Sequence, residues 1–297
     1  MKKNILLTGA TGFLGSNLLK ALLQNEYNVI ILKRSFSNIF RIESLIKKVV
    51  YYDVDKIDLH KIFQENKIDI IIHCATSYGR KKIEPLSTLD ANLVFPLNLL
   101  ELGTKYGVKA FLNTDTILDK RINYYSLSKN QFKDWLKMYS NKLVCINIVL
   151  EHFYGPNDDN SKFVTFIINS LLMEPIKIDL TEGDQIRDFI YIDDVVNVFI
   201  VILKNIEEFK QNLYNLEVGT NKPISIKSFV KTVKKIIGNH KTLLNFGALP
   251  YRRNEIMSFK TNTEAIRDLG WVPKISLEEG LKKTMEVEKE KIRKEKK

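Results

Sequence analysis

Tyr125 and Lys129 are the residues whose types and spacing best suit proton chemistry. Residues four apart on a helix share a face, and Phe132 and Leu136 continue that face as an apolar stripe. Burying an ammonium group is costly, so a lysine on such a stripe indicates that the residue has a functional role. In this interpretation the lysine lowers the pKa of the Tyr125 phenol from its usual value of about 10, so the phenol exchanges a proton near neutral pH. The alternative is a lysine near a helix start whose charged end reaches solvent.

The segment 4–15 carries a second chemical pattern, because an apolar run there breaks into Gly9, Gly12 and Gly15. The apolar spacing predicts a strand before the glycines and a helix after them. Glycines at such a turn let the backbone approach a ligand, and the amino end of a helix attracts anions, so the turn suits a pyrophosphate. The spacing is one residue longer than the usual dinucleotide fingerprint, and a plain turn is the alternative.

A sheet of parallel strands is needed to bring these groups together. Apolar runs that alternate with helical segments predict such a sheet. The predicted strands are 5–7, 29–32, 49–52, 68–72, 109–112 and 143–150, and the later helices are 89–102 and 124–139. Trp135, Leu136 and Tyr139 lie at core spacing on the last helix. Ligands of doubly wound sheets lie at the carboxyl ends of the strands, where we expect the site.

The chain changes character after Gly155-Pro156, where the elements become short and polar turns separate them. We therefore predict an α/β fold, with a doubly wound parallel (Rossmann) sheet, a smaller α/β substrate-binding cap and the site in the cleft between them. The expected boundaries are 1–155 for the dinucleotide-binding domain, with 187–217 returning to it, 156–186 and 218–285 for the cap, and 286–297 for a charged, frayed tail. The helices expected in this half are 163–173, 193–204, 226–237 and 277–286, and Trp271 is expected to anchor a turn.

The net charge of +11 raises nucleic acid, an acidic membrane surface or an anionic small molecule as partners. The charge is thinly spread, and no zinc-finger spacing or aromatic array indicates nucleic acid. No apolar run is long enough to span a membrane, and Met1 leads straight into the first strand, so we expect a cytoplasmic protein. Cys74 and Cys145 fall in apolar strands without metal-site spacing, so we expect no metal.

The ordered motifs resemble the extended, sugar-nucleotide-modifying branch of the short-chain dehydrogenase/reductase superfamily, the NAD-dependent epimerase/dehydratase family. They are TGATGFLG at 8–15, Asp53, HCA at 73–75, Asn92, YSLSK at 125–129, YGP at 154–156 and RDFIYIDD at 187–194. The resemblance implies an oxidoreductase with catalytic Thr114, Tyr125 and Lys129. It also implies a cofactor-binding set of Gly9, Thr11, Gly12, Phe13, Leu14, Gly15, Asp53, Val54, Cys74, Ala75, Thr76, Tyr125 and Lys129.

The cofactor type depends on the charge after the second strand. An NAD enzyme places Asp or Glu there for the ribose 2′-hydroxyl, whereas this chain has Lys33 and Arg34. Two cations suit a 2′-phosphate, so we add both residues to the cofactor-binding set and favour NADPH, with NADH or NAD left possible. A solvated basic turn is the alternative.

The segment 113–116, Asn-Thr-Asp-Thr, bears on the reaction. The family's 4,6-dehydratases carry Thr-Asp-Glu here, and a hydroxyl at Thr116 is a poor base for the C5 proton. With the short link from Thr114 to Tyr125, the chain most resembles reductases of nucleotide-linked 4-keto-6-deoxyhexoses, the group that contains the CDP-abequose synthases. That resemblance implies NADPH-dependent C4 reduction for bacterial surface polysaccharide (lipopolysaccharide) synthesis. The alternatives are a nucleotide-sugar 4-epimerase with tightly bound NAD, and a non-catalytic nucleotide-binding scaffold or sensor.

The same resemblance implies a nucleotide-diphospho-sugar substrate with Arg187 and Arg252 on its phosphates, since arginine pairs with them bidentately. The candidate substrate-binding residues are Ser77, Tyr78, Asp115, Thr116, His152, Lys162, Phe163, Arg187 and Arg252. His152 is either a hydrogen-bond partner of a hexose or a structural histidine. Arg187 could instead pair with Asp188, and Arg253 is an equal candidate to Arg252. Dimerisation through two helices is common in the superfamily, so we expect a homodimer.

Overall fold

The structure, a computed structural model, describes residues 2–79, 84–252 and 254–295 and divides into two units. Unit 1 comprises Met1–Leu150, Val196–Glu217 and Asp268–Gly270, and unit 2 comprises Glu151–Val195, Val218–Arg267 and Trp271–Lys297. The segment that returns to unit 1 therefore begins at 196 rather than at the expected 187. The reason is that 189–191 pair as a strand with 152–154, which keeps them in unit 2.

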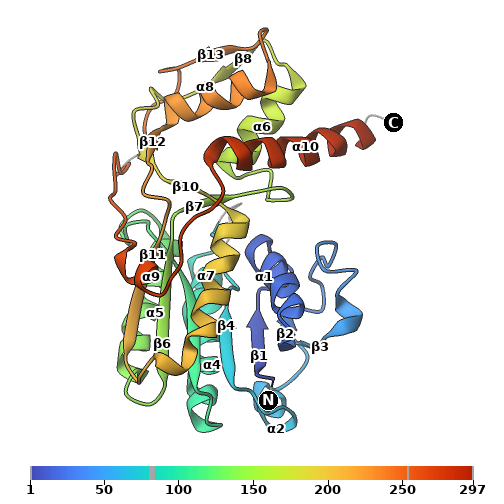
Figure 1. The fold of residues 1–297 in the computed structure, drawn as a ribbon, viewed down its shortest axis with the longest axis vertical. Helices are drawn as coiled ribbons and strands as arrows, with labels where there is room; N and C mark the ends of the chain where they lie inside the picture. Colours follow the sequence, from blue (N-terminus) through green and yellow to red (C-terminus); the bar gives the residue numbers. More distant parts are fainter. Residues whose placement is uncertain (1, 80–83, 253, 296–297) are drawn as a thin grey trace. The chain divides into compact units, whose positions relative to one another are not determined.

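Unit 1 is built on a seven-stranded sheet in the order β11-β6-β5-β4-β1-β2-β3 (Figure 1). Its strands are β1 (Asn4–Thr8), β2 (Asn28–Lys33), β3 (Val50–Asp53), β4 (Ile70–His73), β5 (Ala110–Thr116), β6 (Val144–Leu150) and β11 (Leu213–Val218). Strands β1 to β6 pair in parallel. Most are near-continuous runs of Ile, Leu and Val because both faces of the sheet are covered. The predicted doubly wound α/β sheet is confirmed, with its strand order reversing between β1 and β4.

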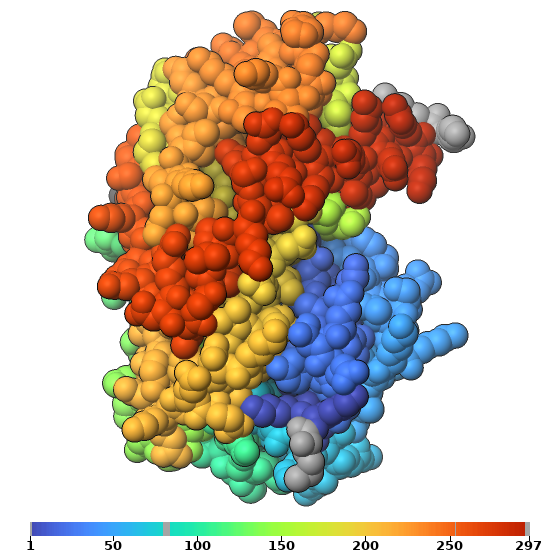
Figure 2. Space-filling view, viewed as in Figure 1, coloured from blue at the N-terminus to red at the C-terminus, as the bar shows by residue number. Residues whose placement is uncertain are grey.

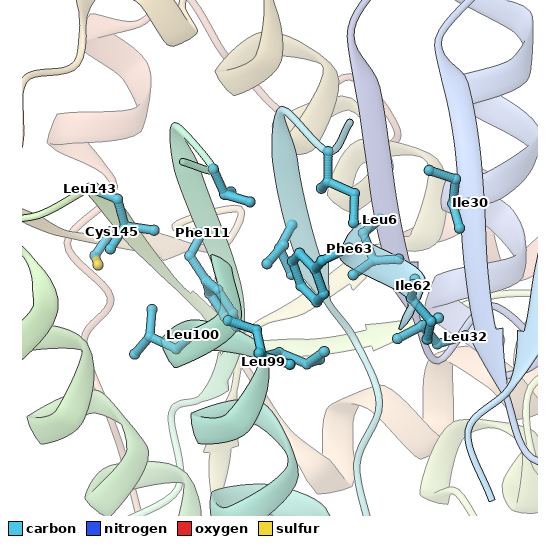
Figure 3. Packing of buried hydrophobic residues seen from close by; sticks show 14 of the residues in the cluster. Leu6, Ile30, Leu32, Ile62, Phe63, Leu99, Leu100, Phe111, Leu143 and Cys145 are labelled. Carbon is cyan, nitrogen blue, oxygen red and sulfur yellow. The ribbon is translucent and has the colours of Figure 1, made fainter. Parts of the chain in front are cut away.

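Helices cover both faces of this sheet. On one face, α2 (Leu59–Glu65), α4 (Phe95–Lys105) and α5 (Tyr124–Tyr139) pack against the strands. Phe63, Leu99 and Phe111 belong to the buried cluster beneath them (Figure 3). On the opposite face, α1 (Phe13–Gln24) lies beside α7 (Ile192–Lys204), as the ribbon and the space-filling view (Figure 2) both show. The sheet therefore holds the loops at its carboxyl edge on a rigid support.

The helix predicted at 89–102 is longer and is not uniform. It runs through α3 (Pro85–Leu89), a wider π-helical turn η2 (Asp90–Val94) and α4. Pro96 lies just after the π-helical turn, where the regular i to i−4 pairing is already interrupted, so its missing N–H is accommodated there. Turns of the π type are rare and concentrate at functional sites.

Unit 2 contains α6 (Phe163–Met173), α8 (Ile226–Ile237) and α10 (Leu277–Glu295), which pack on one another, and the short α9 (Glu264–Asp268) begins in it. Three pairs of short strands complete it: β7 (His152–Tyr154) with β10 (Phe189–Tyr191), β9 (Ile186–Arg187) with β12 (Ile224–Ser225), and β8 (Lys177–Asp179) with β13 (Leu243–Asn245). Helix α10 continues past 286, where a frayed tail was expected. Its buried Glu288 accepts hydrogen bonds from Asn157 N and Lys291 Nζ, which ties this part of the helix to the unit.

The aromatic predictions had mixed outcomes. Trp271 is fully buried and its Nε1 donates to Asp194 O at 3.0 Å, which confirms it as an anchor. Leu136 is buried, but Trp135 is 42% exposed because it lies one residue off the stripe that α5 turns toward the sheet. None of the helices in the described ranges is both long and apolar enough to cross a membrane.

Candidate active site

The glycine turn between β1 and α1 is packed too tightly for side chains at Gly9 and Gly15. A Cβ at Gly9, where φ is +70°, would lie 2.5 Å from Ala75 N, and a Cβ at Gly15 would lie 2.1 Å from Gly9 O. Gly12 precedes α1 and provides no side-chain cap for the first amides of that helix. The glycines therefore let the turn pack tightly against the loop after β4 and against α1, and the backbone amides at the positive end of α1 fit the diphosphate of a dinucleotide.

Thr8 at the end of β1 fastens the loop after β4 to this turn. Its hydroxyl oxygen accepts hydrogen bonds from Cys74 N at 3.2 Å and Ala75 N at 3.1 Å. The single hydroxyl proton is then left for His73 Nδ1, 2.9 Å away, which makes His73 a neutral imidazole with its proton on Nε2. Burial and the nearby Lys129 charge both hold the pKa of His73 well below its usual range, in agreement with that assignment. Cys74 and Ala75, both predicted to bind the cofactor, are thus held through their main chain.

Two of the predicted cofactor residues pair with each other. The Lys33 ammonium at the end of β2 forms an ion pair with Asp53 at the end of β3, because the two residues are register partners in the sheet. We expected Lys33 to meet a 2′-phosphate and Asp53 to bind the cofactor. Arg34 is exposed, and its guanidinium lies over the Phe36 ring. The sequence reasoning missed Arg41, whose Nη1 donates to Thr11 O of the glycine turn at 3.5 Å.

Helix α5 presents the predicted Tyr125 and Lys129 from its first turns. Asn123 starts the helix with a capping box, accepting from Ser126 N while the Ser126 hydroxyl lies within hydrogen-bond distance of Asn123 N. Lys129 is only 2% exposed, so the alternative of a lysine that reaches solvent is wrong. Its Nζ donates to Thr114 O at 3.0 Å, and burial lowers its pKa to about 8. The Tyr125 ring packs against the Tyr78 ring, with centroids 4.9 Å apart.

Thr114, Asp115 and Thr116 end β5, which is longer than predicted. The Thr114 hydroxyl donates to His73 O at 3.0 Å and keeps its lone pairs available. The Asp115 carboxylate accepts from Asn147 Nδ2 on β6 and from Thr116 N, both at 2.8 Å. The substrate residue expected at 115 is therefore directed into the sheet, and Asn147 is a further residue that sequence reasoning missed. The sequence feature that could have identified Asn147 is a single amide side chain inside an otherwise apolar strand.

Asn92 on η2 joins three segments around these residues. Its Oδ1 accepts from Thr76 Oγ1 and Ser77 N, and its Nδ2 donates to Ser77 O and to Ser128 Oγ of α5. Four partners saturate this buried amide, so Ser77 is held through its backbone. The π-helical turn is what places Asn92 between the β4 loop and α5.

The remaining substrate candidates belong to unit 2. His152 Nδ1 lies 3.1 Å from the buried Glu151 carboxylate, a partner that was not predicted. Arg187 Nη2 donates to Glu255 at 2.6 Å, so the proposed pairing with Asp188 is wrong. Burial lowers the pKa of Arg187, and Glu255 opposes that shift. Asp188 instead accepts hydrogen bonds from Thr220 and Asn221.

Other residues of this set lie near the start of α6 or on a loop. Lys162 immediately precedes α6, and the Phe163 ring packs 5.9 Å from that of Phe229. Arg252 is exposed, and its rival Arg253 lies outside the described residues.

Two further features are separate from this chemistry. A hollow of about 420 Å³ lies at the amino ends of β1, β2 and β3, the opposite edge of the sheet from the glycine turn. Burial raises the pKa of Cys74 and of Cys145 to about 12, which leaves both as unreactive thiols at neutral pH. Within the described part of the chain, no three His, Cys, Asp or Glu side chains gather as a metal site.

Comparison with known proteins supplies the family. The model of the NAD dependent epimerase/dehydratase family matches residues 5–216. The chain is similar to the CDP-abequose synthase of Salmonella muenchen, with 36% identity over 294 residues that cover 96% of this chain and 98% of that protein. It is 26% identical over 316 residues to the dTDP-4-dehydro-6-deoxyglucose reductase of Escherichia coli, covering 95% and 96% of the two chains.

Among solved structures, the UDP-glucose 4-epimerase of Thermotoga maritima with UDP-glucose superposes with a TM-score of 0.86. Its identity to this chain is 25%, over 97% of this chain and 99% of that one. The proteins similar to this chain therefore include both reductases and epimerases.

Proposed function

Because the chain belongs to the NAD-dependent epimerase/dehydratase family, an extended short-chain dehydrogenase/reductase family, we propose that it reduces the C4 keto group of a nucleotide-diphospho-4-keto-6-deoxyhexose with NADPH. The product would serve bacterial surface polysaccharide synthesis. The chain is an NAD(P)-dependent oxidoreductase by family, and the similarity to CDP-abequose synthase supports the substrate class. The observation that carries the proposal is the buried Lys129 ammonium, bonded to Thr114 O one helical turn from Tyr125.

NADPH fits the residues around the glycine turn. A Cβ at Gly9 or Gly15 would collide with backbone, so these glycines keep the turn tight, and the amino end of α1 that follows has no side-chain cap and suits a diphosphate. Lys33 and Arg34 stand where an NAD enzyme places an acid, although the Asp53 carboxylate pairs with Lys33 and the Asp55 carboxylate accepts hydrogen bonds from Ser35. Since Asp53 pairs with Lys33, the exposed Arg34 is the stronger candidate to bind that phosphate. Arginine suits the role because its guanidinium forms bidentate pairs with phosphate.

The proposed chemistry assigns one task to each catalytic residue. When bound, NADPH would supply the hydride that reduces C4. Tyr125 donates its phenolic proton to the developing oxyanion, and Lys129 favours that transfer because its positive charge stabilises the phenolate left behind. Thr114 would also donate to the oxyanion, which requires its hydroxyl proton to turn away from His73 O.

A dehydratase reaction is disfavoured by the same segment. Asp115 is bonded to Asn147, and Thr116 offers no carboxylate to remove a proton. In unit 2, we propose that Arg187, Arg252, Lys162 and Phe163 bind the nucleotide diphosphate and that His152 binds the sugar. Arginine and lysine supply the positive charge that the diphosphate needs.

A reductase assay tests the proposal. Purified protein is given NADPH with a CDP-, dTDP- or GDP-linked 4-keto-6-deoxyhexose, and the loss of NADPH absorbance is measured. Tyr125→Phe should lower turnover by about 10²–10⁴-fold while NADPH binding, followed by fluorescence, is retained. Tyr124→Phe is the matched control, because this neighbouring side chain is exposed. A protein that consumes no NADPH but interconverts UDP-hexoses, with NAD co-purifying, would be the 4-epimerase instead.

A homodimer is proposed from the outer faces of two helical segments in unit 1. Trp135 and Met138 of α5, with Leu86 of α3 and Val94 of η2, expose large apolar side chains. Helix α5 packs beside both α3 and η2, and contiguous exposed apolar patches are typical of protein interfaces. A cytoplasmic location stays a prediction.

A further inference from the structure

Lys129 is a buried cation whose described hydrogen bond goes to a neutral carbonyl. Taking an ammonium out of water costs several kcal/mol unless an anion compensates it. Thr114 O supplies a dipole at 3.0 Å but no charge. An anion that keeps Lys129 protonated should therefore lie close to it.

Asp115 is placed to supply that charge. Alternate residues of a strand share a face, so Asp115 shares the face of Phe111 on β5. The Phe111 ring packs 5.7 Å from the Phe132 ring of α5, so this face is the one that α5 covers. Lys129 precedes Phe132 on the same buried side of α5. The Asp115 carboxylate and the Lys129 ammonium thus occupy one layer between sheet and helix.

A network of amides holds this carboxylate in place. Asn147 Nδ2 donates to Asp115 Oδ2 at 2.8 Å and also to Asn215 Oδ1 at 3.1 Å. Asn113 Nδ2 donates to Asn147 Oδ1 at 2.7 Å, which fixes the amide from its other end. Thr116 N donates to the second carboxylate oxygen of Asp115. With donors on both oxygens, Asp115 is confined to one orientation.

We infer that Asp115 is a positioning residue, clamped by Asn147, that acts through Lys129 by keeping its ammonium protonated beside Tyr125. The inference rests on the proposed function for its catalytic meaning and deepens it. It explains why an aspartate stands at 115 although Thr116 replaces the glutamate of a dehydratase. Asp115 then serves as a fixed negative charge rather than as an acid that contacts substrate.

The other charged or titratable groups around Lys129 do not replace this anion. His73, at the end of β4, is neutral, and the Cys74 thiol that follows it has a pKa raised to about 12 by burial. Tyr125 lies on the same helix one turn earlier and is the group to be activated. Burial lowers the pKa of Lys129 to about 8, and Asp115, a carboxylate on β5, opposes that shift.

The test is a titration of Lys129 in the ligand-free protein, which does not depend on turnover. Lysine labelled with ¹³C at Cε is followed by NMR against pH, and Lys129→Met identifies the signal. Asp115→Asn should lower the midpoint of the titration by about one pH unit or more, because it removes the neighbouring negative charge. Asn147→Ala keeps the Asp115 charge but removes a hydrogen bond that holds the carboxylate in place. It should lower the midpoint by about half as much.

Asn113→Ala is the matched control, since it removes a buried amide of the same network without touching the carboxylate. Its midpoint should fall less than that of Asn147→Ala, because Asn147 still donates to Asp115 and to Asn215. An unchanged midpoint in Asp115→Asn, or an equal fall in Asn113→Ala, would overturn the inference. If Asp115→Asn does not fold by circular dichroism, the inference depends on Asn147→Ala, and an unchanged midpoint there overturns it.

Activity separates this inference from the proposed function. In an active reductase, the alkaline fall of kcat should move to lower pH in Asp115→Asn, because Lys129 loses its proton earlier. A wild-type protein with no reductase activity would refute the proposed function, yet the NMR midpoint would still decide the role of Asp115.

Discussion

Replacing Gly15 by alanine tests whether the tight glycine turn is needed for cofactor binding. Gly15 lies in the first turn of α1, where helix propensity alone would favour alanine by up to about 1 kcal/mol. The new Cβ would lie 2.1 Å from Gly9 O and 2.6 Å from Gly9 C. These are backbone atoms that cannot rotate away, so the turn must open. Overpacking of this kind costs about 1–3 kcal/mol, which outweighs the gain in propensity.

Two measurements follow from this substitution. The free energy of unfolding of Gly15→Ala should fall by about 1–2 kcal/mol, the overpacking cost less the propensity gain. The Kd for NADPH, measured by fluorescence, should rise by about tenfold or more, which corresponds to about 1.4 kcal/mol. Gly103→Ala in α4 is the control, because its Cβ would come closest to the flexible end of Ile71, at 2.9 Å from Cδ1, and would otherwise meet Val108 at an ordinary 3.5 Å. It should leave NADPH binding unchanged.

The free energy of unfolding and the Kd for NADPH together distinguish a glycine needed only for packing from one needed for cofactor binding. A Gly15→Ala variant that unfolds like the wild type would refute the steric argument. A variant that loses stability but binds NADPH with full affinity would show that the turn packs the helix without holding the phosphates.

Three further outcomes are expected. Arg34→Ala should raise the Kd for NADPH by about tenfold and leave that for NADH unchanged, since only NADPH carries the 2′-phosphate; equal changes for both would refute this role. Between about pH 8 and 10.5 the unfolded chain holds the Lys129 proton that the folded chain has lost, so stability should rise with pH in that window by about 3 kcal/mol. Lys129→Met should lack this rise in urea unfolding. Met138→Glu should convert the proposed dimer to monomers in light scattering, whereas Met173→Glu, another exposed methionine, should not.

Much of the fold was predictable because its signals are local. The bounds of α5, α6 and α8 agree with the predicted helices 124–139, 163–173 and 226–237, since apolar spacing and end-capping residues act within a few positions. The limits of the prediction also have local causes. The strand β5 runs on through polar residues to Thr116, because pairing with β6 continues there whatever the side chains.

Side-chain partners were much harder to predict than elements. Lys33 was expected to bind a 2′-phosphate, yet it pairs with Asp53, which is its neighbour only because β2 and β3 align in register. Arg187 was weighed against the adjacent Asp188, whereas its partner is Glu255, far along the chain. Proximity in sequence is a poor guide to ion pairs when tertiary packing sets the distances.

The sequence by itself determined the alternation of strands and helices, the glycine turn and the pairing of Tyr125 with Lys129 on one helix face. These depend on backbone geometry over a few residues, which amino-acid type controls directly. Only the tertiary structure decided that Lys129 is fully buried and that Asp115 turns toward Asn147. Both depend on how β5, β6 and α5 stack, and that arrangement is set by the packing of the whole sheet rather than by any short segment.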